Sequence, residues 1–324
     1  MSGGLDRPVF VCGAERSGTS LVYALLSSHP HVSMVRRTNM WRWFYGKFGD
    51  LNDPANLDEA LAALTRYKRL APLDPDWDRI RRELEAGPRT YRRLFELLNG
   101  HHAERVGRPR WGDKSLHTEY FATALFGEFP DARVIHMVRD PRDRYASIAN
   151  RYDEPSKGIP SATGRWLASV RAGEANLAHF PDRYLLLRFE DLLEDPVAVT
   201  SRLCAFIEEP FEPEMMHMSG APEHETGNSS FGDIAPKSIS TAPIGRYRTA
   251  LRAADIAFIQ TVAGRRMRRL GYTLDRVELR GSARRHFGAV TLPRNAFRLA
   301  AWSLRQRRTQ MHERPPAARL VEAS

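Results

Sequence analysis

A loop rich in glycine and hydroxyl side chains is the first part of the chain whose residue types could do chemistry. Residues 13–20 read GAERSGTS and lie between an apolar run at 8–12 and a helical pattern that begins at Thr19. The apolar run predicts a buried strand, so the loop joins a strand to a helix. In such a turn, successive backbone N–H groups point to one place and the helix N-terminus adds partial positive charge. We therefore expect the loop to bind a phosphate group.

This loop lacks the lysine of nucleoside triphosphatases, whose pattern is GxxxxGK[ST]. Thr19 occupies the lysine position, and Arg16 is the cation inside the loop. Gly18 allows the backbone to approach an anion closely, and the hydroxyls of Thr19 and Ser20 can donate further hydrogen bonds. The loop therefore suits a 5′-phosphate group without the usual chemistry of ATP and magnesium.

A second basic segment could bind another phosphate group. Arg133–Val138 predicts a strand, and Asp140 predicts the N-cap of the helix that follows. Arg139 lies at the carboxyl end of this strand, where ligands of open α/β sheets are found. Because a guanidinium group can donate two hydrogen bonds to a phosphate, we expect Arg139 to lie near Arg16. The alternative is a capped helix start with a solvated run of charges.

These two segments resemble the P-loop sulfotransferase family, which uses 3′-phosphoadenosine-5′-phosphosulfate (PAPS) as its sulfuryl donor. The string GAERSGTSLVYALLSSHP is similar to the family's loop RSGT[ST], which precedes a leucine-rich helix and HP. The string VRDPRDRYASI is similar to its RxPxDxxxS pattern. The resemblance implies that the 5′-phosphosulfate is bound by Arg16, Ser17, Gly18, Thr19 and Ser20. It also implies that Arg139 and Ser147 bind the 3′-phosphate.

Three later strings resemble further parts of the same family. Lys114 lies in WGDKS, and the resemblance implies that it contacts the phosphosulfate and offsets charge on the bridging oxygen; an exposed lysine is the alternative. RFEDLLEDP is similar to the family's YEDL segment, with Phe189 in place of the tyrosine. Arg246 lies in IGRYR, which resembles a segment that closes over the nucleotide.

The general base does not carry over from the family. In the tyrosylprotein branch a glutamate follows the HP, and Arg37, flanked by Arg36, stands at that position here. We expect sulfuryl transfer to a hydroxyl or amine of a small molecule, carbohydrate or lipid rather than a protein tyrosine. The two arginines indicate either an anionic acceptor or a solvated edge.

Several side chains near Lys114 could replace that base. His117 is three residues further on and would share a face with Lys114 on a helical turn, which makes it the first candidate. Asp113, His101 and His102 are the others. We therefore assign catalytic roles to Lys114, Arg16 and His117.

Strands that alternate with helices predict an α/β protein. We expect a P-loop-like three-layer fold with a mostly parallel central sheet and helices on both faces. Tyr184–Arg188 is a third strand candidate. The aromatic residues Trp41, Trp43, Phe44 and Tyr45 are expected to line an apolar acceptor cleft or to lie in the core.

We expect the chain to divide into a sulfotransferase domain over 1–275 and a basic C-terminal extension over 276–324. Within the domain, 8–30 is expected to form the 5′-phosphosulfate unit and 133–150 the 3′-phosphate unit. Residues 217–245 are irregular and are expected to form a lid or an acceptor region. The extension could contact an anionic membrane surface, or pack on its own domain or a second subunit, which we favour.

Composition narrows the class of protein further. The chain has 324 residues, a formal net charge of +10 and two cysteines, and no cluster of Cys and His with zinc spacing. It shows no signal peptide and no apolar run of transmembrane length, which predicts a cytoplasmic protein without a disulfide scaffold. A basic balance favours anionic partners.

Three other functions fit parts of this pattern. A P-loop nucleotide kinase would require ATP and magnesium, which the threonine at position 19 opposes. A basic nucleic-acid-binding protein would show salt-sensitive binding, but no zinc finger, RNP signature or heptad-linked basic region is present, so we expect no nucleic-acid partner. A pseudoenzyme would bind PAPS without turnover. We expect PAPS as co-substrate, an unidentified acceptor and no metal.

Overall fold

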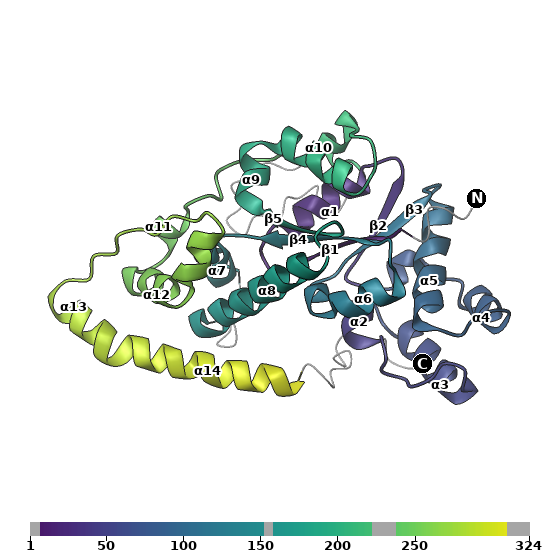
Figure 1. The fold of residues 1–324 in the computed structure, drawn as a ribbon, viewed down its shortest axis with the longest axis horizontal. Coiled ribbons are helices and arrows are strands. Elements are labelled where there is room, and N and C mark those ends of the chain that lie inside the picture. The colour runs from purple at the N-terminus through teal and green to yellow at the C-terminus, as the bar shows by residue number, and fades with distance from the viewer. Residues whose placement is uncertain (1–6, 152–157, 222–237, 310–324) are drawn as a thin grey trace.

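A computed structural model describes residues 7–151, 158–221 and 238–309 of the chain. Five strands form one sheet in the order β2-β3-β1-β4-β5, and every neighbouring pair is parallel (Figure 1). The strands are β1 (Val9–Gly13), β2 (Val32–Arg36), β3 (Arg110–Lys114), β4 (Arg133–Val138) and β5 (Tyr184–Arg188). The predicted parallel α/β fold is therefore confirmed.

Helices cover both faces of this sheet and give three layers (Figure 1). The first half of the chain supplies α1 (Thr19–Ser27), α2 (Met40–Trp43), α3 (Pro54–Thr65), α4 (Trp77–Glu85), α5 (Tyr91–Arg105), α6 (Ala122–Glu128) and α7 (Pro141–Ala149). The second half supplies α8 (Ile159–His179), α9 (Phe189–Glu194), α10 (Pro196–Phe206), α11 (Tyr247–Ala250), α12 (Ala253–Arg269), α13 (Gly281–His286) and α14 (Leu292–Thr309). No helix among the described residues is long and apolar enough to cross a bilayer.

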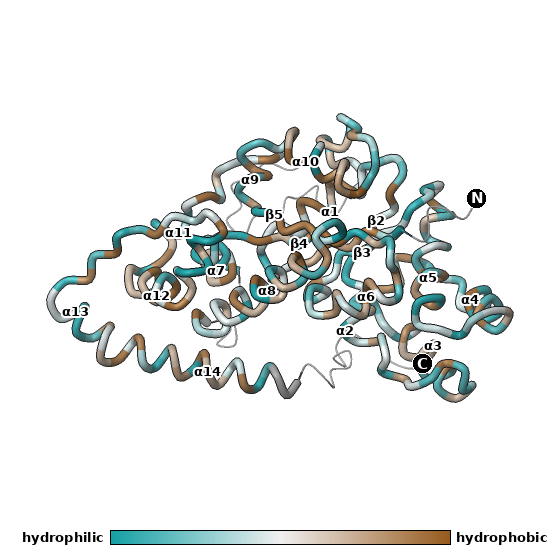
Figure 2. The backbone as a smooth tube through the Cα atoms, viewed as in Figure 1, coloured by the Kyte–Doolittle hydropathy of each residue, from teal (hydrophilic) through white to brown (hydrophobic). Residues whose placement is uncertain are grey.

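Strand β1 shows why the sheet must be covered on both sides. Val9 and Val11 pack in one apolar cluster with residues of α1, α9 and α10. Phe10 and Cys12 pack in another with residues of α2, α5 and α6. Successive side chains of a strand point to opposite faces, so a strand that is apolar throughout must be buried on both. Figure 2 shows the central strands as largely hydrophobic.

The two strands that the sequence does not reveal lie together at one edge. Strand β3 reads RWGDK, and all five residues are buried although three of them are charged. Such a segment shows neither the apolar run nor the alternation that identifies a strand. The predicted strands at 8–12, 133–138 and 184–188 are present, and Asp140 caps α7 by accepting a hydrogen bond from the backbone N–H of Arg142.

The aromatic residues after Asn39 lie in the core. Trp41, Trp43 and Phe44 are buried among side chains of α3 and α5, and Tyr45 packs against the same cluster. Of the two expected positions, the structure shows the core, because α2 turns these side chains inward and leaves Arg42 to face the cleft described below.

The C-terminal helix α14 packs on the domain through α8. A Cβ atom added at Gly164 of α8 would lie 2.5 Å from Cε3 of Trp302 and 2.7 Å from Cδ1 of Leu299. Only a residue without a side chain allows this close approach. Phe287, just before the helix, and Leu292, its first residue, pack against the cluster that contains Trp166 of α8.

We predict that Gly164→Leu separates α14 from α8. The new side chain overlaps Trp302, and such overpacking costs about 1–3 kcal/mol, so cleavage by trypsin between α12 and α14 becomes roughly ten- to a hundredfold faster. Gly127→Leu is the matched control, because a Cβ atom at this helical glycine of α6 meets nothing within 4 Å. Equal cleavage rates for the two variants would contradict the predicted packing.

Candidate functional site

The loop between β1 and α1 has the backbone geometry that its glycines predict. Gly13 and Gly18 have φ angles of 133° and 91°. A Cβ atom at Gly18 would overlap the ring of Phe189, so both the dihedral angle and the close contact require glycine. Arg16 also has a positive φ, 66°, which non-glycine residues seldom adopt. The loop therefore holds one non-glycine residue, Arg16, in a strained backbone conformation just before the N-terminus of α1.

The two predicted phosphate-binding segments meet at the carboxyl edge of the sheet. Nη1 of Arg139 donates a hydrogen bond to the backbone carbonyl of Arg16 at 3.3 Å. Nε of Arg16 in turn donates to Oγ of Ser147 at 2.9 Å. The expected proximity of Arg139 and Arg16 is thus present, although the two residues are 123 positions apart.

Phe189 contacts both the loop and Arg139. Its ring contacts Gly18, and the Cζ atom of Arg139 lies 4.9 Å from the ring centroid. A cation over an aromatic face is attracted by the ring quadrupole. The residue that replaces the family's tyrosine therefore packs against both segments.

Asp143 positions the segment that contains Arg246. Its carboxylate accepts hydrogen bonds from the backbone N–H groups of Gly245, at 2.7 Å, and Tyr247, at 2.8 Å. Arg246 lies between these two anchored residues, and its charge is one of those that act on Arg139. The aspartate of the RxPxDxxxS pattern thus positions the late GRYR string, a role that the sequence does not indicate.

The run RDPRDR is not a solvated charge run. The side chains of Arg142 and Arg144 are only 2% and 1% exposed. Arg142 pairs with Asp140 at 2.6 Å and donates to the backbone carbonyl of Thr273 at 2.8 Å. Arg144 donates to the carbonyl of Glu15 in the loop at 2.6 Å. These buried guanidinium groups fasten the loop and the C-terminal part of the domain to α7, which sequence reasoning missed.

Lys114 is buried at the end of β3, with an exposed fraction of 4%. Its Nζ atom donates to Oγ of Ser20 at 3.4 Å and lies 5.7 Å from the ring centroid of Tyr23. An exposed lysine is thus excluded. The argument that His117 shares a helical face with Lys114 is wrong, because Lys114 is in a strand and His117 has a left-handed backbone, with φ of 74°.

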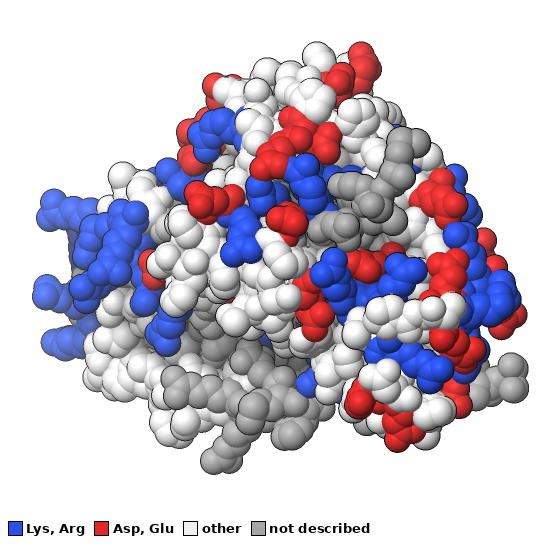
Figure 3. Space-filling view, turned by 45° about the vertical axis from the view of Figure 1, so that its right-hand side comes forward, with Lys and Arg blue, Asp and Glu red and all other residues white. Residues whose placement is uncertain are grey.

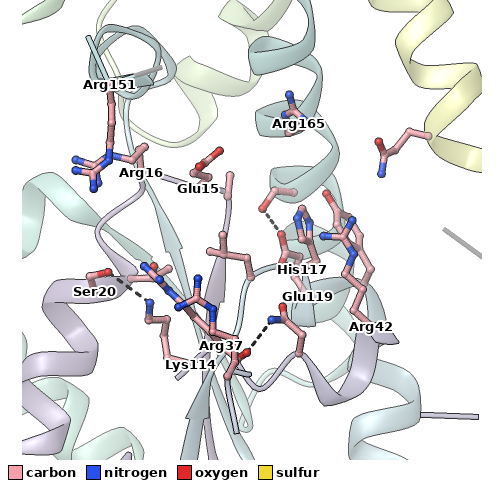
Figure 4. A pocket seen from close by; sticks show the side chains of 18 of the residues that line it. Glu15, Arg16, Ser20, Arg37, Arg42, Lys114, His117, Glu119, Arg151 and Arg165 are labelled. Atoms are coloured by element: carbon pink, nitrogen blue, oxygen red, sulfur yellow. Dashed lines mark hydrogen bonds between the residues drawn. The ribbon is translucent and has the colours of Figure 1, made fainter. Parts of the chain in front are cut away.

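A cleft of about 490 Å³ nevertheless brings these two residues together. Of the residues that line it, seven are Arg or Lys and two are Glu among the parts of the chain that the structure describes: Arg16, Arg37, Arg42, Arg69, Lys114, Arg151 and Arg165, with Glu15 and Glu119. Figure 4 shows Ser20, Arg37 and Lys114 on one side and Arg42, His117 and Glu119 on the other. Trp302 and Gln306 of α14 also line the cleft.

The two titratable groups opposite Lys114 have strongly shifted pKa values. Burial, together with the positive charges of Arg42, Arg165 and Arg144, lowers the pKa of His117 to about 3. Burial raises the pKa of Glu119 above its usual value. Oε1 of Glu119 accepts a hydrogen bond from Ser169 at 2.7 Å, whereas Oε2 has no hydrogen-bond partner among the described residues. Glu119 has no motif around it and was missed.

The other candidate bases do not line this cleft. Asp113 precedes Lys114 on β3, so its side chain points to the opposite face of the sheet. His101 and His102 lie on α5, where Nε2 of His101 donates a hydrogen bond to Oε2 of Glu83 at 3.1 Å.

The predicted lid or acceptor region at 217–245 is described only in part, because residues 222–237 lie outside the described residues.

The sequence comparisons identify the family of this chain. A model of the sulfotransferase family matches residues 8–213, so the chain belongs to that family. Protein-tyrosine sulfotransferase A of Caenorhabditis elegans is 23% identical over 225 residues, which cover 64% of this chain and 52% of that protein. Carbohydrate sulfotransferase 5 of Mus musculus is 26% identical over 169 residues, 43% of this chain and 41% of that protein. The chain thus matches about half the length of these relatives or less.

Solved structures show the same fold. The sulfotransferase domain from the curacin biosynthetic pathway aligns with a TM-score of 0.53 and 18% identity, over 83% of this chain and 99% of that one. The sulfotransferase domain of the Synechococcus PCC 7002 olefin synthase aligns with a TM-score of 0.52 and 20% identity, over 79% and 94%.

We predict that His117 makes the protein less stable as the pH falls. Its pKa is about 3 in the folded chain and about 6.5 in an unfolded one, so between pH 7 and pH 5 only the unfolded chain takes up this proton. The free energy of unfolding then falls by up to about 2 kcal/mol over this range, and His117→Gln removes that part of the loss.

Urea unfolding of the wild type and the variant at both pH values measures the difference. His217→Gln, at an exposed histidine, is the control for substitution itself. If the wild type and His117→Gln lose equal stability between pH 7 and pH 5, the histidine is not held neutral.

Proposed function

We propose that this chain transfers the sulfuryl group of PAPS to a hydroxyl or amine of an acceptor bound in the cleft. The observation that carries the proposal is the hydrogen bond from Arg139 to the carbonyl of Arg16. It brings a strand-end arginine beside a glycine-bordered helix N-terminus, which suits a nucleotide with phosphate groups at two positions.

The donor would lie along the carboxyl edge of the sheet. The 5′-phosphosulfate would bind the N–H groups of the loop from Arg16 to Ser20 and the positive end of α1. The 3′-phosphate would bind Arg139 and Ser147, and Arg246 would close over it. Ser17 supports this reading, because its buried hydroxyl has no hydrogen-bond partner among the described residues.

Transfer would be an in-line displacement at sulfur. The bond from sulfur to the bridging oxygen of the 5′-phosphate breaks, and a bond from sulfur to the acceptor oxygen or nitrogen forms. Lys114 and Arg16 offset the negative charge that develops on the bridging and equatorial oxygens. A sulfuryl group carries less charge than a phosphoryl group, so these cations and the loop N–H groups suffice without a metal.

Among the described residues that line the cleft, no group of His, Cys, Asp and Glu side chains has the spacing of a metal site. Within the described residues, the cluster with metal-binding spacing consists of His29, His31 and Glu209. None of the three lines the cleft. Nδ1 of His29 accepts a hydrogen bond from the backbone N–H of His31, and Nε2 pairs with the carbonyl of Pro210, so both ring nitrogens are already engaged.

The acceptor proton would pass to His117 or Glu119. His117 is neutral at physiological pH and can accept a proton, but its lowered pKa makes it a weak base. Glu119 lines the same cleft, and its raised pKa makes its carboxylate the stronger base. We therefore retain His117 as a contact to the acceptor and add Glu119 as the proton acceptor.

The charge of the cleft favours an anionic acceptor. Arg37, Arg42, Arg69 and Arg165 line it beyond the residues assigned to the donor. A small molecule, carbohydrate or lipid that carries a negative group fits this lining better than a protein tyrosine. Thr19 still opposes a kinase, and the shared cleft of Lys114 and Glu119 favours an enzyme over a pseudoenzyme.

Arg139→Met tests the donor site. We expect the variant to bind adenosine 3′,5′-bisphosphate about ten- to a hundredfold more weakly, because one charged donor to the 3′-phosphate is lost. Binding of adenosine 5′-monophosphate, which has no 3′-phosphate, should stay within a fewfold of the wild type. Isothermal titration calorimetry measures both, with Arg202→Met, at an exposed arginine of α10, as control. Equal weakening for the two nucleotides would contradict the assignment of Arg139.

Lys114→Met tests the transfer step. We expect kcat to fall about a hundredfold or more, because the cation stabilises charge that develops only in the transition state. The Kd of adenosine 3′,5′-bisphosphate should change only a fewfold. Radiolabelled PAPS with a panel of neutral and anionic phenols and sugars, in buffer containing EDTA, identifies the best acceptor for the measurement.

Lys68→Met is the control for removal of a lysine, since Lys68 is exposed and does not line the cleft. A Lys114→Met variant with unchanged kcat would remove this residue from the mechanism. Turnover abolished by EDTA in the wild type would remove the metal-independent mechanism.

A further inference from the structure

Helix α14 carries two faces of different chemistry. Its inner face holds Trp302 and Gln306, which line the cleft, and Leu299, which packs on α8. Its outer face holds Phe297 and Leu304, with exposed fractions of 75% and 61%. These two residues are seven positions apart, so they lie one above the other along the helix. Figure 2 shows hydrophobic and hydrophilic residues alternating along α14.

The exposed apolar side chains of the molecule concentrate here. Among the residues that the structure describes, six large apolar side chains are exposed: Val106, Leu177, Val197, Val290, Phe297 and Leu304. Three of these six fall between positions 290 and 304. Single exposed apolar residues are ordinary. Two that are aligned on one helix, with Val290 a further seven positions before Phe297, indicate a contact surface.

Arginines accompany this apolar stripe. Residues 281–306 contain five arginines and no Asp or Glu: Arg284, Arg285, Arg294, Arg298 and Arg305. Arg294 and Arg298 are exposed and form no ion pair within the described part of the chain. On a helix of 3.6 residues per turn, Arg294, Arg298 and Arg305 lie along one flank of the stripe. Figure 3 shows Lys and Arg gathered at the left-hand end of the molecule, where α12 and α13 lie in Figure 1.

We propose that the outer face of α14 docks on a lipid bilayer that contains anionic headgroups. Phe297, Leu304 and Val290 would enter the boundary between headgroups and acyl chains, and the arginines would contact the phosphate groups beside them. An apolar stripe with arginines on its flank is the pattern of helices that lie in the plane of a membrane.

Charge favours a bilayer over a second copy of this chain. Two copies joined through this face would place the same arginines opposite one another, with no acidic side chain in 281–306 to pair with them. A zwitterionic bilayer would lack the negative charge that the flank requires. The docked face is the side of α14 opposite Trp302, which lines the cleft.

Vesicle flotation with the full chain tests this proposal. The wild type should float with vesicles of phosphatidylglycerol and phosphatidylcholine, and not with vesicles of phosphatidylcholine alone. The double variant Phe297→Ser/Leu304→Ser should lose binding at least about tenfold, because the apolar contacts are removed. Arg294→Glu/Arg298→Glu should lose it as well, and raised salt should weaken binding of the wild type.

The control is Val106→Ser/Val197→Ser, which removes two exposed apolar side chains from other surfaces and should float like the wild type. Thermal unfolding of each variant shows whether the fold is intact, since these positions are exposed. Failure of the wild type to float with anionic vesicles would overturn the proposal. So would flotation of a folded Phe297→Ser/Leu304→Ser variant at wild-type level. A wild-type dimer in sedimentation that this variant converts to a monomer would assign the face to a second copy instead.

Discussion

One guanidinium group joins the two ends of the candidate nucleotide site. Arg139 follows β4, and the loop that contains Arg16 follows β1; because these strands are parallel neighbours, their carboxyl ends lie side by side. Parallel pairing thus places residues more than a hundred positions apart within hydrogen-bonding distance, which no local sequence pattern can do. The loop and the segment around Pro243 meet at this side chain, because the carbonyls of Arg16 and Pro243 both accept hydrogen bonds from it.

Buried arginines make the same kind of connection elsewhere around α7. A buried guanidinium group needs hydrogen-bond acceptors. Backbone carbonyls can supply them without a buried carboxylate. Arg142 meets the carbonyl of Thr273 and Arg144 meets those of Glu15 and Ala162, so one helical turn reaches three separate parts of the chain. The basic composition of the protein is therefore partly structural, and only part of the net charge is available to ligands.

Sequence reasoning recovers features whose cause is local and misses those whose cause is tertiary. The loop at 13–20 and the cap at Asp140 follow from neighbouring residues, and the strands at β1, β4 and β5 from apolar runs. The sequence did not predict strand β3, because its residues are charged as well as buried. Their burial results from β1 and β2, which pair with it on either side. Glu119 was not predicted as a site residue, because no neighbouring residue in the sequence indicates that the fold buries its carboxylate. The aromatic residues of α2 could not be assigned to core or cleft until the direction of that short helix was known.

Phe189 acts as a spacer of fixed thickness. Its ring contacts Gly18 and lies 4.9 Å from the Cζ atom of Arg139. A six-membered aromatic ring cannot be compressed, and its edges offer no hydrogen bonds that could vary the separation. A ring of fixed size therefore limits how closely Arg139 and Gly18 can approach, so the proposed nucleotide site would select a ligand by its length as well as by its charge.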